Sequence, residues 1–209
     1  SNWYDWGCPQ CSEGNFGIIH TGPRGWSGPE YAQGWSFNVP TEAFYNSFAA
    51  GDTRQDATVL DIEAFATATG ATYTEGYEHT GYYNNKYIPR AGESGAQTEL
   101  NYLTNYRAVR YSDVLLMAAE AYNRGGIDDG IAQEYLNQVR RRAFGDQDHD
   151  IFLTGTALTD AIWEERKFEL SMEGHRFFDL VRTGQATSII DGFQQGKHEV
   201  FPIPQQEID

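Results

Sequence analysis

The second half of the chain carries a helical pattern of apolar residues. In the stretch from 107 to 126, large apolar and small side chains recur at intervals of three or seven, which places them on one side of a helix. These residues are Val109, Leu116, Ala119 and Tyr122. Two glycines then follow at 125 and 126, where a helix is expected to end. The spacing therefore predicts one helix that stops at this pair of glycines.

A second helix is predicted directly after the glycines. Acidic residues stand near its start and arginines occupy 140–142 at its end, an arrangement that suits the helix dipole. Its apolar face consists of Ile131, Tyr135, Leu136 and Val139. Together the two helices are expected to form an antiparallel hairpin of the kind that builds helical repeats, although one copy is not a repeat.

A third helix is predicted after a polar loop. Thr154 or Thr156 can cap its start, and the pattern runs through Ile162, Phe168 and Leu170 to a stop at Gly184. The tail beyond it ends in HEVFPIPQQEID, whose prolines favour extended backbone.

The first half of the chain reads as less regular. Residues 1–39 combine turn-forming glycines and prolines with large aromatic residues, which indicates long ordered loops. Thr41 is a plausible cap for a short amphipathic helix that stops at Gly51. Within 71–90, tyrosines alternate with polar residues, and two short strands are possible there.

Composition and charge narrow the class of protein. The 209 residues suffice for one sizeable domain, and the net charge of -15 disfavours nucleic acids and anionic lipid surfaces as partners. A neutral partner is favoured instead. No run of about 18 apolar residues predicts a membrane span, and the first residues lack the pattern of a signal peptide. Any export signal is therefore expected to have been removed or to lie outside this chain.

The segment Phe168 to Arg182, FELSMEGHRFFDLVR, places charged residues where a core-facing helix carries aliphatic ones. As a glycosidase site, Glu169 and Glu173 at i, i+4 could approach the roughly 5 Å separation of a retaining enzyme. As a metal site, His175 and Asp179 would share a face. The third interpretation is a buried network of ion pairs, which the nearby arginines favour because they lower carboxylate pKa values, whereas a general acid needs a raised one.

The predicted ion network extends through this segment. Glu169 and Glu173 are expected to pair with arginines such as Arg166, Arg176 or Arg182 rather than to act in catalysis. The full set of its predicted members is Arg166, Glu169, Glu173, Arg176, Asp179 and Arg182. Gly174 is expected to permit close approach between helices.

Two further groups of residues suggest local chemistry. Cys8 and Cys11 are the only cysteines, and a small disulfide loop is favoured over a free pair or a partial metal site. Asp146, Asp148 and Asp150 alternate as at the start of a calcium loop, but the glycine and glutamate of an EF-hand are missing. A solvated acidic loop is favoured there, and a looser structural calcium site stays open as the one cofactor considered.

Aromatic residues point to a ligand. Four of the five tryptophans fall within the first 35 positions, in loops that also carry polar side chains. Flat rings on ordered loops could stack on the apolar faces of sugars while polar groups bind the hydroxyls. The alternative is that these rings pack the interior of a region that has few aliphatic residues.

Four ordered motifs of the second half resemble the C-terminal part of SusD/RagB-family proteins. They are RYSDVLLMAAEAYNRGG, YLNQVRRRA, AIWEERKFELSMEGHRFFDLVRTG and VFPIPQQEI, and the similarity reaches back to WSFNVPTEAFYNSFAAGDTR. It covers about 35–209, whereas the aromatic loops of 1–33 match no motif of the family.

This resemblance implies a mainly α-helical, SusD-like fold with tetratricopeptide-like helix pairs, long irregular loops and few short strands. It also implies a surface-exposed outer-membrane lipoprotein that is not an enzyme and that delivers oligosaccharides, or alternatively peptides, to a SusC-like TonB-dependent transporter. The lipid anchor would lie outside this chain, which is expected to be a fragment of a longer protein. Within one continuous domain, residues 1–100 would form a loop-rich ligand-binding portion and 101–209 a helical portion.

Ligand-binding residues in such proteins commonly come from variable loops, so the candidates are aromatic and polar residues of the first half. We predict contacts to the ligand from Trp6, Arg24, Trp26, Tyr31, Tyr82 and Tyr83. A lid that seals the transporter and contacts no ligand, and a glycosidase, are the two contrasting functions.

Overall fold

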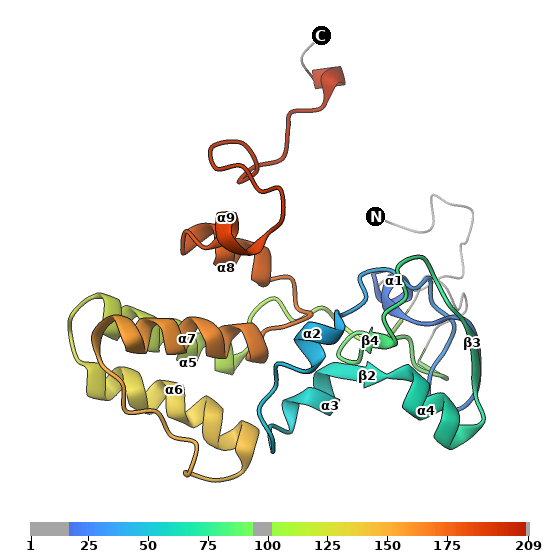
Figure 1. The fold of residues 1–209 in the computed structure, drawn as a ribbon, viewed down its shortest axis with the longest axis horizontal. Helices are drawn as coiled ribbons and strands as arrows, with labels where there is room; N and C mark the ends of the chain where they lie inside the picture. The colour runs from blue at the N-terminus through green and yellow to red at the C-terminus, as the bar shows by residue number, and fades with distance from the viewer. Residues whose placement is uncertain (1–16, 94–101, 208–209) are drawn as a thin grey trace.

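The computed structural model describes residues 17–93 and 102–207, and its fold is mainly helical with a few short strands, as predicted (Figure 1). The elements of the first half are α1 (Ile18–Thr21), β1 (Arg24–Ser27), α2 (Glu42–Tyr45), α3 (Arg54–Thr58), β2 (Val59–Asp61), α4 (Ile62–Thr69), β3 (Thr72–Thr74) and β4 (Tyr82–Asn84). Those of the second half are α5 (Tyr111–Arg124), α6 (Asp129–Phe144), α7 (Gly155–Glu169), α8 (Arg176–Arg182), α9 (Ala186–Ile189) and the 3₁₀ turn η2 (Gln205–Glu207).

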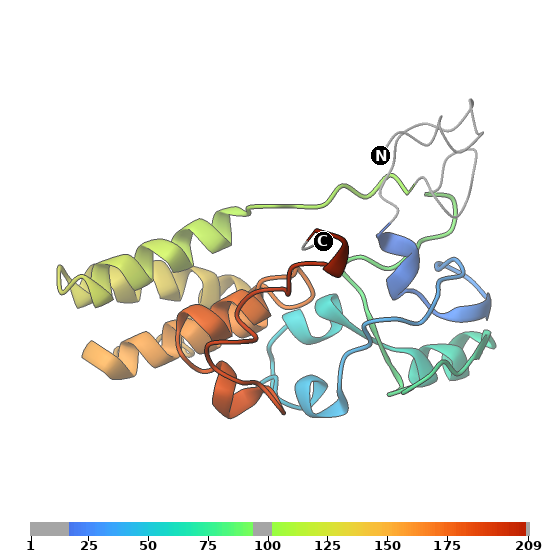
Figure 2. The same cartoon turned by 90° about the horizontal axis from the view of Figure 1, so that it is seen from above.

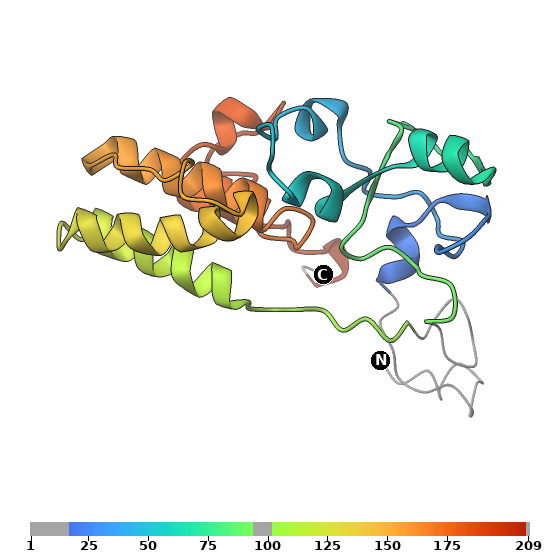
Figure 3. The same ribbon diagram turned by 90° about the horizontal axis from the view of Figure 1, so that it is seen from below.

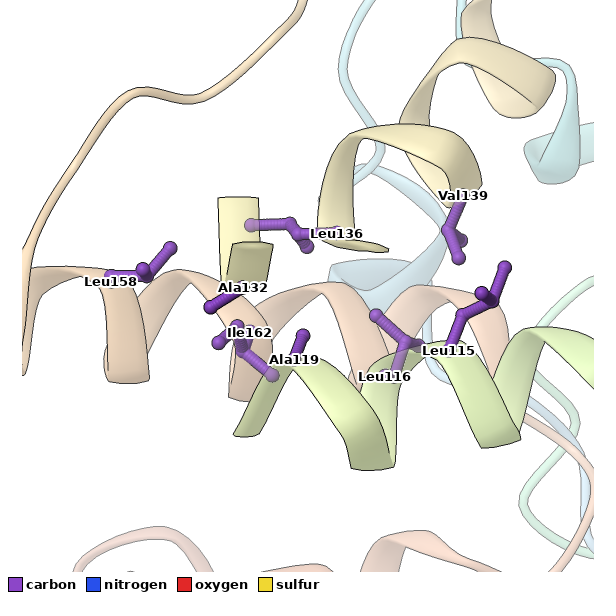
Figure 4. Close-up of a cluster of buried hydrophobic side chains, with 8 residues drawn as sticks. All are labelled: Leu115, Leu116, Ala119, Ala132, Leu136, Val139, Leu158 and Ile162. Atoms are coloured by element: carbon purple, nitrogen blue, oxygen red, sulfur yellow. The ribbon is translucent and has the colours of Figure 1, made fainter. Parts of the chain in front are cut away.

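Helices α5, α6 and α7 pack as a three-helix layer. The predicted antiparallel hairpin is confirmed: α5 ends at Arg124 with Gly125 as its C-cap residue, and Asp128 caps α6 by accepting hydrogen bonds from the amides of Gly130 and Ile131. Figure 4 shows the apolar side chains of the three helices pointing toward one another. The buried cluster is Leu115, Leu116, Ala119, Ala132, Leu136, Val139, Leu158 and Ile162. Each large member stabilises the fold by about 1.5–3 kcal/mol through removal from water.

The third predicted helix is broken in two. The α7 helix ends at Glu169 and α8 begins at Arg176, so the expected continuous helix to Gly184 is wrong. Met172 and Gly174 adopt the left-handed backbone conformation, with φ of 64° and 85°, and an α-helix cannot pass through such residues. The resulting turn directs the side chain of Glu173 away from the helix axis toward other segments of the chain.

The described part of the first half, residues 17–93, contains two small antiparallel sheets. Strand β1 pairs with β3, and β2 pairs with β4, with Leu60 opposite Tyr83. The two short strands expected within 71–90 are confirmed as β3 and β4. The helices α3 and α4 were not predicted, since the apolar pattern of 54–69 is short and ambiguous, although Asp61 caps α4 by accepting from the amide of Ala64.

The predicted cap at Thr41 is confirmed, because its hydroxyl accepts a hydrogen bond from the amide of Phe44. The helix is shorter than expected, however, and ends at Tyr45 rather than near Gly51. Two apolar clusters hold this half together. One is Tyr31, Leu60, Ile62, Tyr83 and Ile88, and the other is Ile18, Ile19, Tyr87 and Tyr102.

Figures 2 and 3 show how the two halves are joined. The segment before α5 crosses from the strand-containing half to the helical layer as extended chain, and α2 and α3 lie near the ends of α6 and α7. The expected portion boundary at 100 falls within 94–101, outside the described residues. Beyond α9 the chain leads away from the helices, with Phe201 92% exposed (Figure 1). Within 17–93 and 102–207, no helix has the length and apolar character that crossing a membrane requires.

Candidate functional site

A cleft of about 320 Å³ opens in the first half of the chain. Its walls combine aromatic rings with charged and amide side chains from two loops and the start of β1. The lining residues are Arg24, Trp35, Ser36, Phe37, Asn38, Val39, Tyr77 and Glu78. Aromatic surface with a few polar groups is the usual composition of a small-molecule binding site.

The backbone of this cleft is held in uncommon conformations. Ser36, Asn38 and Glu78 have positive φ angles of 59°, 53° and 55°, which residues other than glycine seldom adopt. The two loops meet at Gly76, where a Cβ atom would approach the Cβ of Ser36 to 2.7 Å. Such conformations persist only where surrounding contacts fix them, and they cluster at ligand sites.

Ser36 supplies part of that fixation. Its hydroxyl accepts a hydrogen bond from the backbone amide of Arg24 at 2.9 Å and bonds the hydroxyl of the buried Tyr83 at 3.0 Å. The guanidinium of Arg24 donates to the carbonyl oxygen of Trp35 at 2.9 Å. The cleft loops are therefore tied to β1 and to the core beneath β4.

The aromatic rings of the cleft differ in exposure. Tyr77 is 88% exposed and Phe37 is 51% exposed. Trp35 is partly buried, and its ring meets His20 and Phe37 edge to face, with centroids 4.9 and 6.4 Å apart. The arrangement can receive the apolar face of a ring-shaped ligand on Phe37 or Tyr77 while Arg24, Asn38 and Glu78 meet its polar edge.

Of the predicted ligand-binding residues that the structure describes, only Arg24 lines this cleft. Tyr31 is 5% exposed and Tyr83 has no exposed surface, so their rings belong to the core and the prediction for these two is wrong. Trp26 is partly buried against Tyr31 and Phe65. These rings replace aliphatic packing, which is the alternative that the sequence left open.

The other predicted residues lie elsewhere. Tyr82 is partly exposed and stacks on Tyr45, with ring centroids 4.4 Å apart. Trp6 and the proposed Cys8–Cys11 disulfide lie outside the described residues.

Sequence reasoning missed Trp35, Phe37 and Tyr77. The sequence did contain a local signal for these residues. Trp35 and Phe37 belong to the stretch GWSF, which begins with a glycine, and Tyr77 follows Gly76 in the stretch EGYE. Loops run over the surface of a protein, so an aromatic residue among turn-forming residues is a better candidate for exposure than one on a strand, such as Tyr83.

The carboxylates of 168–182 are engaged in a buried ion network, as predicted, but with other partners than those expected. Glu169 pairs with Arg110 at 3.0 Å, with Arg54 at 3.4 Å and also with Arg142. Glu173 pairs with Lys86 and with Arg110, both at 2.7 Å. Neither glutamate pairs with Arg166, Arg176 or Arg182 among the described residues. Glu169 is the last residue of α7 and Glu173 lies in the turn after it, and both carboxylates face segments that the sequence could not place beside them.

A second group of ion pairs joins α5, α7 and α8. Arg166 pairs with Asp113 at 2.7 Å and with Asp179 at 3.0 Å, and Arg182 pairs with Asp179 and Glu120 at 2.7 Å. Arg176, predicted as a member, makes no ion pair within the described ranges, so this part of the prediction is wrong. It follows the left-handed turn, outside the stripe that a continuous α7 would have formed.

The electrostatics of the two glutamates differ from those of a catalytic acid. Burial alone would raise the pKa of Glu169, but Arg142 and Arg110 more than offset it and leave the pKa lowered. Burial also opposes ionisation of Glu173, yet Arg110 and Lys86 bring its pKa below the usual value. A general acid needs the opposite shift, so the geometry favours a structural role for both.

The described residues hold no cluster of three histidine, cysteine, aspartate or glutamate side chains that could bind a metal ion. In the acidic loop, Asp150 pairs with Arg141 and Asp146 pairs with His149, so two of the three aspartates considered for calcium already have partners.

Comparison with known proteins identifies the family. The model of the SusD family matches residues 61–198, about two thirds of the chain. The chain belongs to the SusD family. It is 31% identical to SusD-like protein P2 of Formosa agariphila over 90% of its length.

Solved SusD-like structures superpose on this one. A laminarin-binding SusD-like protein is 39% identical, with a TM-score of 0.80 over 93% of this chain. Surface glycan-binding protein A from Bacteroides thetaiotaomicron, solved in complex with laminarihexaose, is 32% identical, with a TM-score of 0.84 over 98% of this chain. The chain spans 41% of the length of the Formosa relative and 42% and 46% of these two structures.

Proposed function

We propose that this chain is part of a surface glycan-binding protein and that the cleft of Phe37 and Tyr77 contributes to an oligosaccharide site. The observation that carries the proposal is an ordered cleft in which two exposed rings stand beside Arg24, Asn38 and Glu78. Glucose rings present apolar faces edged by hydroxyls, and such faces fit aromatic surfaces bordered by hydrogen-bonding groups.

Family membership supports the class of ligand. The SusD-like structures that share 39% and 32% identity with this chain are named for binding laminarin and for a complex with laminarihexaose. We therefore propose a neutral glucan of this kind, which also agrees with the net charge of -15. The same relatives give no support to the peptide alternative.

We further propose that the full-length protein lies at the cell surface, held to the outer membrane by a lipid anchor, and passes its ligand to a SusC-like TonB-dependent transporter. It would bind glycan without cleaving it, because the carboxylates that most resemble a catalytic pair are neutralised in ion pairs. The lid hypothesis predicts that no residue of this chain contacts ligand, so the cleft variants below separate it from the proposal.

Titration calorimetry with laminarihexaose tests the proposal. We expect Tyr77→Ala and Phe37→Ala each to weaken binding by about tenfold, the loss of one aromatic contact. Tyr111→Ala is the matched control, because Tyr111 is 73% exposed but lies at the start of α5, outside the cleft. Equal affinity in all three variants would contradict the proposed site.

A reducing-sugar assay addresses catalysis on the same samples. We expect no release of sugar from laminarin by the unmodified protein. Turnover that disappears in Glu169→Gln would establish the glycosidase interpretation instead.

A further inference from the structure

A second cavity lies at the junction of the two halves, apart from the aromatic cleft. Its volume is about 230 Å³, and it is bordered by α3, the loop after β4, the extended segment before α5 and the ends of α6 and α7. The lining residues are Arg54, Ala57, Thr58, Lys86, Arg107, Arg110, Arg142, Glu169 and Glu173. Five of these are basic and two acidic, in a protein whose overall charge is strongly negative.

The two acidic side chains that line this cavity already form ion pairs. Arg110 contacts Oε1 of Glu169, and Arg54 contacts Oε2 of the same carboxylate. Arg110 donates hydrogen bonds to both carboxylate oxygens of Glu173, and Lys86 contacts its Oε1. Arg54 also forms ion pairs with Asp52 and Glu165, and Arg140 forms one with Glu165. Asp52, Glu165 and Arg140 do not line the cavity themselves. The ion-paired groups and the unpaired Arg107 of the cavity wall together contribute six basic and four acidic side chains. The basic ones are Arg54, Lys86, Arg107, Arg110, Arg140 and Arg142, and the acidic ones are Asp52, Glu165, Glu169 and Glu173. An excess of two positive charges therefore remains.

Arg107 carries part of that excess. Within the described residues its guanidinium makes no ion pair, and it lies over the ring of Tyr87, 5.7 Å from the centroid. The side chain of Arg142 is 58% exposed and has Glu169 as its only described ion partner. Both guanidiniums retain N–H groups for a further acceptor.

The hydroxyl of Thr58 is independent evidence for a ligand in the cavity, because it lacks a hydrogen-bond partner within the described residues. Thr58 lines the cavity and is only 1% exposed, yet its buried hydroxyl has no hydrogen-bond partner in the described structure. Buried hydroxyls are nearly always bonded, and one left alone costs free energy. A neutral water could bond the hydroxyl, but it would leave the excess positive charge uncompensated.

We propose that this cavity is a binding site for a small oxyanion, a carboxylate or sulfate group, held by Arg107 and Arg142 and by a hydrogen bond from Thr58. The oxyanion accepts from the guanidinium N–H groups at the mouth and from the hydroxyl at the wall, which satisfies both. The site is distinct from the aromatic cleft, and the proposal does not depend on the glycan ligand.

Thermal unfolding with sulfate tests the site, because a ligand that binds only the folded state raises the Tm. Sulfate is compared with chloride at equal ionic strength, and calorimetry measures the dissociation constant directly. Acetate tests a small free carboxylate, and glucuronate tests a carboxylate carried by a sugar. Glucose is the uncharged control for glucuronate. We expect binding of sulfate and of at least one carboxylate, with none for glucose. A stronger signal for glucuronate than for acetate would identify an acidic sugar as the source of the anion.

Two variants locate the binding. Arg107→Gln removes a positive charge without leaving a described carboxylate unpaired, because Arg107 makes no ion pair within the described residues. We expect it to weaken sulfate binding about tenfold or more. Thr58→Val removes only the unpartnered hydroxyl, so its Tm in chloride should be unchanged or higher while its sulfate affinity falls several-fold. Arg176→Gln is the matched control, since Arg176 also lacks a described ion pair but does not line the cavity.

A protein whose Tm and calorimetric heat do not respond to sulfate, acetate or glucuronate would overturn the proposal. So would sulfate binding that Arg107→Gln and Arg176→Gln weaken equally, because the anion would then be attracted by overall charge. Loss confined to Arg107→Gln and Thr58→Val supports it.

Discussion

Arg110 and Glu173 form a bidentate pair that fastens the start of α5 to the turn after α7. The Nε atom of Arg110 donates to Oε2 of Glu173 and its Nη2 atom donates to Oε1, each at 2.7 Å. The same Nη2 atom also donates to the carbonyl oxygen of Glu169 at 2.9 Å. Parallel hydrogen bonds of this kind are among the strongest in proteins and fix the geometry of both partners.

Removal of the Glu173 carboxylate should destabilise the fold strongly. The Glu173 side chain is 3% exposed, and its loss leaves Lys86 and part of Arg110 without their anionic partner. We expect Glu173→Ala to lower the free energy of unfolding by about 3–5 kcal/mol. Urea unfolding followed by circular dichroism measures this. Glu164→Ala is the control, because Glu164 is 54% exposed in its pair with Lys167 and should cost less than about 1 kcal/mol.

Stability should fall at acid pH partly through Glu120. Burial opposes ionisation of this carboxyl, but hydrogen bonds from Arg182 and Arg124 prevail and lower its pKa from 4.5 to about 2. Because the folded-state pKa is depressed, the stabilisation is present above pH 4.5 and is lost as the pH falls toward 2.

The comparison of wild type with Glu120→Gln isolates this effect. We expect the difference in Tm between the two proteins to be largest near neutral pH and to shrink below pH 4.5. A difference that stays constant down to acid pH would show that Glu120 does not contribute in this way.

Loss of a buried side chain from the three-helix layer should also be costly. Ile162 has no exposed surface and lies among the apolar residues of α5 and α6 (Figure 4). Ile162→Ala is expected to lower the free energy of unfolding by about 2–5 kcal/mol through lost burial and the cavity that remains. Ile127→Ala, at a position 68% exposed, should change it by much less. Similar unfolding midpoints for the two variants would contradict the assigned core.

The left-handed turn after α7 predicts opposite effects at two neighbouring positions. Gly174 has φ of 85° and its Cβ position is nearly open, with only the Tyr106 hydroxyl at 3.6 Å, so Gly174→Ala should cost about 1–2 kcal/mol through backbone strain. Met172 has φ of 64°, so glycine relieves strain there, and Met172→Gly should be neutral or stabilising despite lost packing. Destabilisation of equal size in both variants would count against this conformation.

The helical hairpin could be predicted from the sequence because its signals are local. The apolar spacing that includes Leu116 and Leu136 and the stop at Gly125 set α5 and α6 without reference to distant residues. The break after α7 could not be predicted in this way. Charged residues at 165, 169, 173, 176 and 179 recur at helical intervals, so the sequence pattern continues without a break past Met172.

The site was harder to predict than the fold. An aromatic residue on a pleated strand, such as Tyr83, and one in a turn, such as Tyr77, look alike in composition, yet one is buried and the other is 88% exposed. The partners of Glu169 show the same limit, because Arg54 lies 115 residues away in the chain. Spacing along a sequence reports neighbours on one helix and carries no information on which distant segment will face them.

Those long separations bear on how the chain folds. Arg54 reaches Glu165 across 111 residues, and the hydroxyl of Thr53 donates to the carbonyl oxygen of Ala143 across 90. Contacts between remote segments carry a large loop-closure entropy and tend to form after local hairpins such as α5–α6. Until they form, the charges at this junction remain hydrated and unpaired. We therefore expect the strand-containing half and the helical layer to acquire their final stability together, in one cooperative transition.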